Sequence, residues 1–322
     1  MADTLNDYLK ASKDAMQKGF ISDLLRYSDL MKIVPFAGHD DLQVTGSRWQ
    51  SLPSVGFRKY GGGYSESTGK TEPVSETLAL LGGDVKIEKI GASKNLKTQM
   101  DMKAQATAFA FNHYFVNGDH ASDPDGFEGI KKRVGNMATR QTIYLDSAGN
   151  GTGDALKVLA SSANRQDWLD ALHAAIKRSS ATHLLVNEDT FLGLGQVLRR
   201  EGLLETKTDA YGHEWSAFAG IPFVDIGLKA DKSTEIITNT EDPGDGGNDA
   251  SSIYAVRFDT RDGLHGIYLN ELGGAPKVYD PLNGKEMEGG PQYLRRIDWG
   301  VGLFSLSQYS ITRVQGFKMA AS

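Results

Sequence analysis

The sequence predicts a mixed α+β fold, and three stretches of the chain carry this prediction. Residues 164–224 alternate helix-favouring and strand-favouring segments, beginning with the helical "NRQDWLDALHAAIKRS" and the extended "THLLVN". Residues 94–116 contain no glycine or proline and favour one long helix. Residues 47–90 favour two extended arms around a glycine-rich centre. Helices and strands that alternate over short connections indicate a compact α/β lobe, to which the long helix and the extended arms are added.

Composition limits the classes of protein to which the chain can belong. Of its 322 residues, 39% are hydrophobic and 24% are charged, with a formal net charge of −6. This length suggests two lobes or one elaborated domain, and the hydrophobic share is ordinary for a soluble globular protein. The absence of cysteine excludes disulfides, thiolate metal sites and cysteine nucleophiles. The acidic balance argues against a protein whose main task is binding nucleic acid.

No segment marks the chain for a membrane or for secretion. The apolar runs are shorter than a membrane span requires. The N-terminal stretch "MADTLNDYLKASKDAMQKGF" is polar and of mixed charge, without the apolar centre of a signal peptide. We therefore expect a cytosolic protein that makes no contact with a membrane.

The N-terminal region, residues 3–31, is predicted to form an amphipathic helix or a pair of helices. Apolar side chains recur there at helical spacing, and Leu9 and Phe20 are among them. Such a helix is stable only when its apolar stripe is covered. The cover is either the chain's own body or a neighbouring chain, and the residues alone favour the former.

Residues 47–90 are predicted to form a long β-hairpin with "YGGGYSESTGKTEP" at its tip. The tip contains Gly69-Lys70-Thr71, which suggests a phosphate-binding loop. Such a loop requires a glycine where Tyr64 stands and a helix after the threonine, whereas Pro73 follows almost at once. The phosphate-binding interpretation therefore fails. We expect a polar tip that projects from the core and needs a partner, since a two-stranded ribbon alone is marginal in water.

Two other stretches suggest ligand sites without meeting the requirements. In "NGDHASDPDGFEGI" the acidic residues are out of register with a calcium-binding loop, so turns capped by Asp side chains are the better interpretation. In "TIYLDSAGNGTGDAL" the last glycine of a dinucleotide fingerprint is replaced by Asp154. We predict no catalytic residue, no cofactor site and no metal site. The acidic, glycine-rich residues 239–252 are expected to form an exposed, mobile loop.

Taken together, the order of these elements resembles the major capsid proteins of tailed bacteriophages, whose fold is named after phage Hong Kong 97. Three motifs carry the resemblance: "LLVNEDTFLGLGQVLRREG", "FAGIPFV" and the closing "IDWGVGLFSLSQYSITRVQGF". Each motif is degenerate, but their order and spacing run nearly end to end. The resemblance implies five regions: an N-terminal arm at 1–46, an extended hairpin at 47–90, a peripheral domain with a spine helix at 91–141, an axial domain at 142–270 and return strands at 271–322.

The resemblance implies assembly rather than catalysis. Chains would form pentamers and hexamers of an icosahedral shell around double-stranded DNA, in a virion assembled in the host cytoplasm. A separate scaffolding protein, a portal and a decoration protein are the implied partners, with the DNA enclosed without sequence-specific binding. An encapsulin-type compartment shell is the alternative, and a nucleotide-binding enzyme acting through Lys70 ranks last.

The resemblance also implies which residues make contacts between subunits. The hairpin tip would lie across a neighbouring chain, and the N-terminal helix would also pack on an adjacent subunit. Some relatives join a hairpin lysine to a neighbour's asparagine, for which Lys59 and Lys70 are the candidates here. The predicted contact residues are Arg58, Lys59, Tyr60, Tyr64, Lys70 and Glu72 in the hairpin, and Leu9 and Phe20 in the arm.

Overall fold

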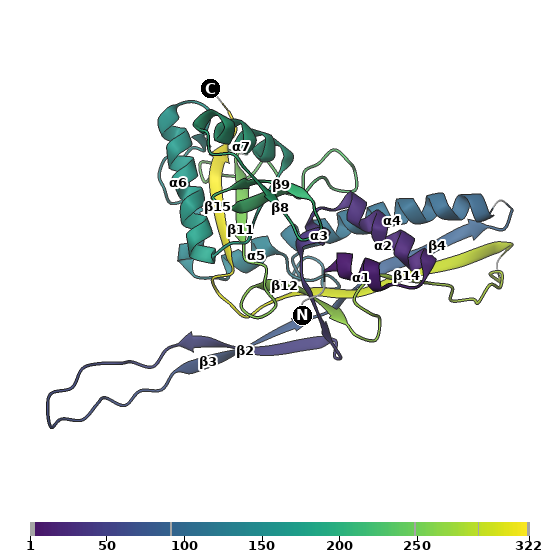
Figure 1. Cartoon of the computed structure of the whole chain (residues 1–322), viewed down its shortest axis with the longest axis horizontal. Coiled ribbons are helices and arrows are strands. Elements are labelled where there is room, and N and C mark those ends of the chain that lie inside the picture. The colour runs from purple at the N-terminus through teal and green to yellow at the C-terminus, as the bar shows by residue number, and fades with distance from the viewer. Residues whose placement is uncertain (1–3, 91, 248, 289, 321–322) are drawn as a thin grey trace.

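The chain consists of a body with two parts and a ribbon that extends far beyond them (Figure 1). This computed structural model describes residues 4–90, 92–247, 249–288 and 290–320, and of residues 92–95 it describes the backbone alone. The mixed α+β class predicted from the sequence is confirmed. Among the described residues, no helix combines the length and apolar content that crossing a membrane would require.

The first part of the body is a long helix laid along a five-stranded sheet (Figure 1). The helix α4 spans Ala92–Asn117, which confirms the prediction of one long helix over 94–116. Its inward side chains recur every three or four residues, from Met100 to Phe115, so one stripe faces the core. The strands of the sheet are β1 (Phe36–His39), β12 (Leu264–Leu269), β14 (Gln292–Ser305), β13 (Lys277–Tyr279) and β4 (Ala79–Glu88).

The second part is the predicted α/β lobe, in which α6 (Ser162–Ser179) and α7 (Glu188–Glu201) cover an eight-stranded sheet. Between these helices runs the strand β7 (His183–Val186), which pairs in parallel with β10 (Ile221–Asp225), as expected for helix–strand alternation. The Asn187 side chain caps α7 by accepting the Thr190 backbone N–H, so the motif's asparagine has a structural role. The strands are β5 (Thr142–Tyr144), β6 (Leu156–Lys157), β7 (His183–Val186), β8 (Glu205–Thr208), β9 (Glu214–Phe218), β10 (Ile221–Asp225), β11 (Ser251–Val256) and β15 (Ile311–Lys318).

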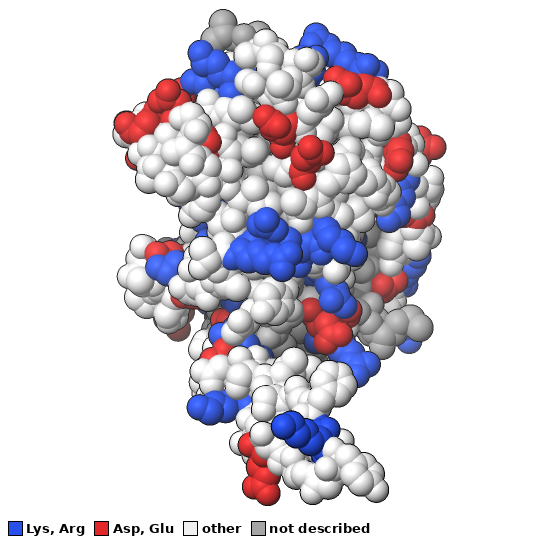
Figure 2. Space-filling model, turned by 90° about the vertical axis from the view of Figure 1, so that its left-hand side faces the viewer, with Lys and Arg blue, Asp and Glu red and all other residues white. Residues whose placement is uncertain are grey.

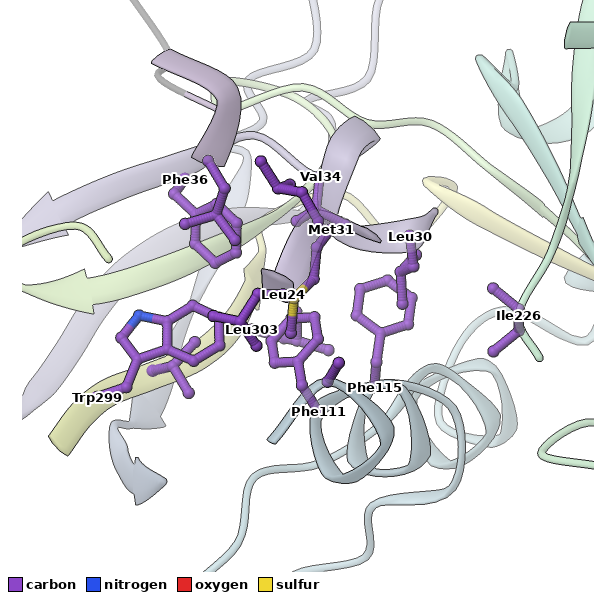
Figure 3. Close-up of a cluster of buried hydrophobic side chains, with 14 of the residues drawn as sticks. Leu24, Leu30, Met31, Val34, Phe36, Phe111, Phe115, Ile226, Trp299 and Leu303 are labelled. Carbon is purple, nitrogen blue, oxygen red and sulfur yellow. The ribbon is translucent and has the colours of Figure 1, made fainter. Parts of the chain in front are cut away.

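The N-terminal arm packs its apolar side on the chain's own body, and the contact of its helix with an adjacent subunit stays a prediction. It forms α1 (Leu5–Ala11), α2 (Ala15–Tyr27) and α3 (Leu30–Ile33). Figure 3 shows Leu24 beside Phe111, in the cluster that includes Trp299. The rings of Phe111 and Trp299 have centroids 5.1 Å apart. The apolar stripe of the N-terminal helices is therefore covered by the body of the same chain.

The predicted hairpin is shorter than residues 47–90, because its second arm divides at Leu78. The paired strands are β2 (Gln43–Ser51) and β3 (Lys70–Thr77). After Leu78 the chain enters β4, which pairs antiparallel with β14 instead of with the first arm. Val85 and Ile87 of β4 are buried in the main core, whereas β3 has no fully buried residue. Burial of these apolar side chains therefore draws the end of the predicted arm into the body.

The acidic residues 239–252 are exposed at their centre, as expected, with residues 242, 244–246 and 249 open to solvent, but Glu241 and residues 250–252 tie the two ends of the loop to the body; Asn248 lies outside the described residues. Glu241 is largely buried, with its side chain 11% exposed, and accepts from Arg313 at 2.7 Å and from Lys131 at 2.6 Å. Burial alone would raise the pKa of Glu241, but the charges of Arg313 and Lys131 outweigh it, and the pKa is lowered. Two cations thus hold this carboxylate ionised between α5 (Ile130–Gly135) and β15.

Candidate functional site

The tip of the hairpin stands apart from the body. Residues 52–69 beyond the paired strands are extended and project into solvent (Figure 1). All of these residues are exposed. Because the tip buries almost nothing, the body provides it with no stabilising cover.

The side chains of the tip are more apolar than predicted. Phe57 and Tyr60 are fully exposed, at 109% and 107%, and Val55 follows at 96%. The sequence predicted a polar tip because polar residues and glycines prevail near its centre. The large apolar side chains come from the first arm of the hairpin, which follows β2. The other exposed apolar side chains of the hairpin are Trp49, Leu52 and Tyr64. Figure 2, which views the molecule from the side toward which the hairpin projects, shows uncharged surface interrupted by a few charged groups along it. Exposed apolar groups gathered in one segment indicate a surface for another protein.

One cation is held in place at the tip. The Arg58 guanidinium lies over the Tyr64 ring, 5.2 Å from its centroid, and donates to the Gly62 carbonyl at 3.2 Å. Gly61 has φ +80°, a left-handed conformation that glycine adopts without strain, and it turns the chain at the tip. The two sides of the tip are thereby linked, which limits the conformations of an otherwise unsupported loop.

The base of the hairpin, by contrast, is fastened firmly to the body. Arg133 of α5 donates to Glu76 of β3 at 2.5 Å and to the Leu303 carbonyl of β14 at 3.0 Å. Gly46 of β2 lies so close to β14 that a Cβ there would be 2.6 Å from the Leu306 side chain and 2.9 Å from Phe304. These contacts fix the direction in which the ribbon leaves the body.

A second polar cluster lies farther along the base. Glu72 of β3 pairs with Arg48 on the facing strand, and it also accepts from Gln308 at 3.1 Å. Gln308 belongs to the turn between β14 and β15, so this cluster ties both strands to the body. The projecting tip is therefore carried on a rigid stem.

The predicted contact residues fall into two groups. Five lie on the exposed hairpin and are available to another molecule. Glu72 is occupied by Arg48, Phe20 is buried in the main core, and Leu9 packs against that core. The Phe20 side chain is only 3% exposed, so in this conformation it packs within its own chain. The five available residues are Arg58, Lys59, Tyr60, Tyr64 and Lys70, and their roles stay predictions.

The motifs that suggested ligands are accounted for within the chain. Lys70 begins the strand β3, so no helix N-terminus faces a phosphate there. In the glycine-rich loop after β5, the backbone N–H groups of Gly151, Thr152 and Gly153 donate to the Asp146 carboxylate. Burial alone would raise the pKa of Asp146, but these donors outweigh it, and the pKa is lowered. Donors that would cradle a phosphate are thus already used.

The acidic turn after α4 has the predicted Asp-capped geometry. Asp119 accepts the Ala121 backbone N–H at 3.1 Å, and Asp123 accepts that of Asp125 at 3.3 Å. Within the described part of the chain, no three His, Asp or Glu side chains converge as metal ligands. The interpretation as turn chemistry is confirmed.

Comparison with known proteins gives a match in structure alone. No family model matches the chain, and no curated protein matches it. The holo-SrpI encapsulin complex from Synechococcus elongatus has a TM-score of 0.58 at 12% identity, covering 90% of this chain and 87% of that chain. A solved structure of Mycobacterium phage Bobi has a TM-score of 0.55 at 10% identity, covering 91% and 89%. The capsid of a native GTA particle has a TM-score of 0.54 at 16% identity, covering 92% and 90%.

These matches define a class of fold that is found in shell-forming proteins. They cover about nine-tenths of the chain. The chain has the Hong Kong 97-type capsid fold, as the resemblance in the sequence implied.

Proposed function

We propose that this chain is a structural protein that assembles with copies of itself into a closed shell, and that it is the major capsid protein of a tailed phage. The observation that carries the proposal is the hairpin, whose stem is fastened to the body while its apolar tip is fully exposed. Covering apolar surface contributes roughly 25 cal/mol for each Å² removed from water. In a solution of the pure protein, another copy of the same chain is the partner that can cover the tip.

The proposed assembly has repeated contacts between unlike surfaces of identical chains. A tip from one copy and a body surface of the next form a heterologous contact, which closes into a ring when the rotation between copies permits. Pentamers and hexamers of an icosahedral head would be such rings. The enclosed double-stranded DNA needs no sequence-specific site, consistent with the chain's net charge of −6.

Accessory proteins belong to the same proposal. A scaffolding protein, a portal and a decoration protein would act as separate chains during assembly in the host cytoplasm and in the virion. A match to the procapsid of satellite phage P4, which includes a size determination protein, supports assembly with such a companion. That likeness has a TM-score of 0.51 over 98% of this chain.

An encapsulin-type compartment is the second candidate. The encapsulin match has a TM-score of 0.58, compared with 0.54 for the GTA capsid and 0.55 for the phage structure described above, so the fold does not separate the two functions. The candidates differ in what the shell contains, which is DNA for a phage head and a cargo protein for a compartment.

Expression of the full chain, alone and with its genomic neighbours, tests both candidates. Negative-stain electron microscopy would show whether closed particles form, and nuclease-protected DNA or a co-purifying protein would identify the contents. Denaturing gel mobility of boiled particles tests whether Lys59 or Lys70 forms covalent links. An ATPase that Lys70→Ala abolishes while assembly persists would restore the enzyme interpretation.

A further inference from the structure

One buried side chain, that of Asn112 on α4, joins the N-terminal arm to the α/β lobe. Its carbonyl oxygen accepts the Ser28 hydroxyl at 2.7 Å, and its amide group donates to the Ile226 backbone carbonyl at 3.1 Å. Ser28 lies between α2 and α3 of the arm, whereas Ile226 directly follows β10 and is bound to β7 through the Val186 carbonyl at 3.0 Å. Figure 3 shows Ile226 next to α4, beside Phe115. Asn112 therefore forms a hydrogen-bonded bridge between arm and lobe.

Acidic side chains lie on both sides of this bridge. Asp29 follows Ser28 in the arm, and Asp225 precedes Ile226 in the lobe. The charges that act on the Asp225 carboxyl are those of Glu188, the first residue of α7, and of Asp29. Because like charges repel, ionised carboxylates on the two sides work against the bond that the bridge makes.

Two further acids adjoin Asp225. The Asn239 amide donates to Asp189 at 2.7 Å and to Glu235 at 2.8 Å, so a neutral side chain separates these two carboxylates. A second neutral amide, that of Asn187, donates to Glu235 at 3.1 Å. We call the five acids the junction carboxylates; they are Asp29, Glu188, Asp189, Asp225 and Glu235.

The nearby cations compensate only part of this charge. Lys32 pairs with Asp29 at 2.5 Å within the arm. Lys229, in the turn after β10, acts instead on His113 of α4, where burial and the Lys229 charge together lower the pKa of the histidine. The junction therefore keeps an excess of negative charge at neutral pH.

We propose that this junction is an acid-tightened latch: Asn112 holds arm and lobe together, and the junction carboxylates repel one another across the bridge until they take up protons. The inference goes beyond the proposed function, because the latch lies within one chain and needs no second copy. With the carboxylates ionised, the lobe separates from the arm more readily. With the carboxylates neutral, the bridge is unopposed, so the mobility between arm and lobe depends on pH.

The direction of the pH effect follows from the electrostatics of the acids. Burial raises the pKa of Asp225, and the charges of Glu188 and Asp29 act in the same direction, against the lowering effect of the Gly227 backbone N–H. Burial also raises the pKa of Glu235. A carboxyl whose pKa rises on folding destabilises the folded state at neutral pH. This cost is removed as the pH falls toward the unfolded value of about 4.

Hydrogen exchange of the full chain, corrected for the intrinsic effect of pH on exchange, tests the latch. Between pH 7.5 and 5.5 we expect protection of α3 and of residues 226–228 to rise at least threefold. Asp225→Asn, which keeps an acceptor for the Gly227 N–H, should give the acid level of protection already at pH 7.5. Asp170→Asn, at an exposed position of α6, removes the same charge elsewhere and should behave as the wild-type chain does.

Three outcomes would overturn the inference. They are no rise in the wild-type chain, a rise that Asp225→Asn retains, and a rise that Asp170→Asn also abolishes. Protonation of His113 cannot imitate the expected result, because a group whose pKa is lowered on folding in this way loses stability as the pH falls.

Ser28→Ala gives a second readout that does not depend on titration. It removes the hydroxyl that donates to Asn112, and we expect protection of α3 to fall at least threefold at both pH values while that of α6 is unchanged. Equal protection in Ser28→Ala and the wild-type chain would contradict the bridge. Particles that form from a chain without the pH effect would refute this inference alone. A pH effect in a chain that never assembles would refute only the proposed function.

Discussion

Arg133 and Glu76 form an ion pair across the base of the hairpin, with 2.5 Å between the guanidinium nitrogen and the carboxylate oxygen. The Arg133 side chain is 8% exposed and that of Glu76 is 18% exposed, so the pair is largely desolvated. Arg133 also donates to the carbonyls of Glu128 and Leu303. This one side chain therefore joins the long connection after α4, the strand β14 and the hairpin stem.

The first prediction concerns the hairpin stem. Glu76→Gln keeps the shape of the side chain but leaves the Arg133 charge uncompensated in a buried place. Removing one partner of a buried ion pair costs about 3 kcal/mol or more. We expect a lower melting temperature and faster amide exchange in β2 and β3. Asp119→Asn, which breaks the more exposed pair with Lys132, is the control and should cost under about 1 kcal/mol. Equal effects of the two substitutions would contradict the role given to Arg133.

The second prediction concerns the N-terminal arm. Leu24 is fully buried beside α4 in a single chain, so Leu24→Ala should destabilise the unassembled protein by about 2–5 kcal/mol. Chemical unfolding of unassembled protein measures this, with Met16→Ala at a 40% exposed position of the same helix as the control. If Leu24→Ala changed only the stability of particles, the arm would pack on a neighbour, as the sequence resemblance implied.

The third prediction concerns the link between the arm and the lobe. The Tyr211 hydroxyl, in the turn between β8 and β9, donates to Asp7 at 2.8 Å and lies 3.0 Å from the Thr4 hydroxyl. Tyr211→Phe removes these bonds and should cost about 1–2 kcal/mol locally, because hydrogen bonds to charged groups are the stronger ones. We expect faster hydrogen exchange in α1 and unchanged exchange in α6. Unchanged exchange in α1 would show that the contact does not hold the arm.

The fourth prediction concerns acid. Burial lowers the pKa of His183 to about 4, and the Lys207 charge acts in the same direction. The unfolded chain binds a proton at this histidine near pH 6.5, while the folded chain stays neutral there. The stability from His183 is therefore complete above pH 6.5 and is lost as the pH falls toward 4, by on the order of 3 kcal/mol.

Unfolding titrations at several pH values test this prediction. His183→Gln should flatten the dependence of the unfolding free energy between pH 6.5 and 4, whereas the exposed His120→Gln serves as the matched control. A wild-type slope that persists unchanged in His183→Gln would assign the acid sensitivity to other groups.

Local sequence signals predicted the elements that depend on local structure. The stretch around Ala104 and Ala108 lacks helix breakers and became the centre of α4. The alternation around Asn187 gave β7, α7 and β10 with a cap at the helix start. The hairpin was also predicted, because its glycine-rich tip interrupts two extended arms.

The features that were missed depend on contacts between distant parts of the chain. Glu76 and Arg133 are 57 residues apart, and nothing near either of them indicates the pair. The division of the second arm at Leu78 follows from pairing with β14, more than two hundred residues later. Whether Phe20 faces its own core or a neighbour could not be decided from an amphipathic pattern, which is the same in both cases.

The most direct test of shell assembly is sedimentation of the intact chain at increasing concentration, compared with a variant carrying Phe57→Ser, Tyr60→Ser and Tyr64→Ser together. We expect rings or megadalton particles from the wild-type chain, and single chains with an unchanged melting temperature from the variant. Leu192→Ser, which removes an exposed apolar group from the lobe, should assemble as the wild-type chain does. A wild-type protein that sediments as a single chain at every concentration would contradict the account.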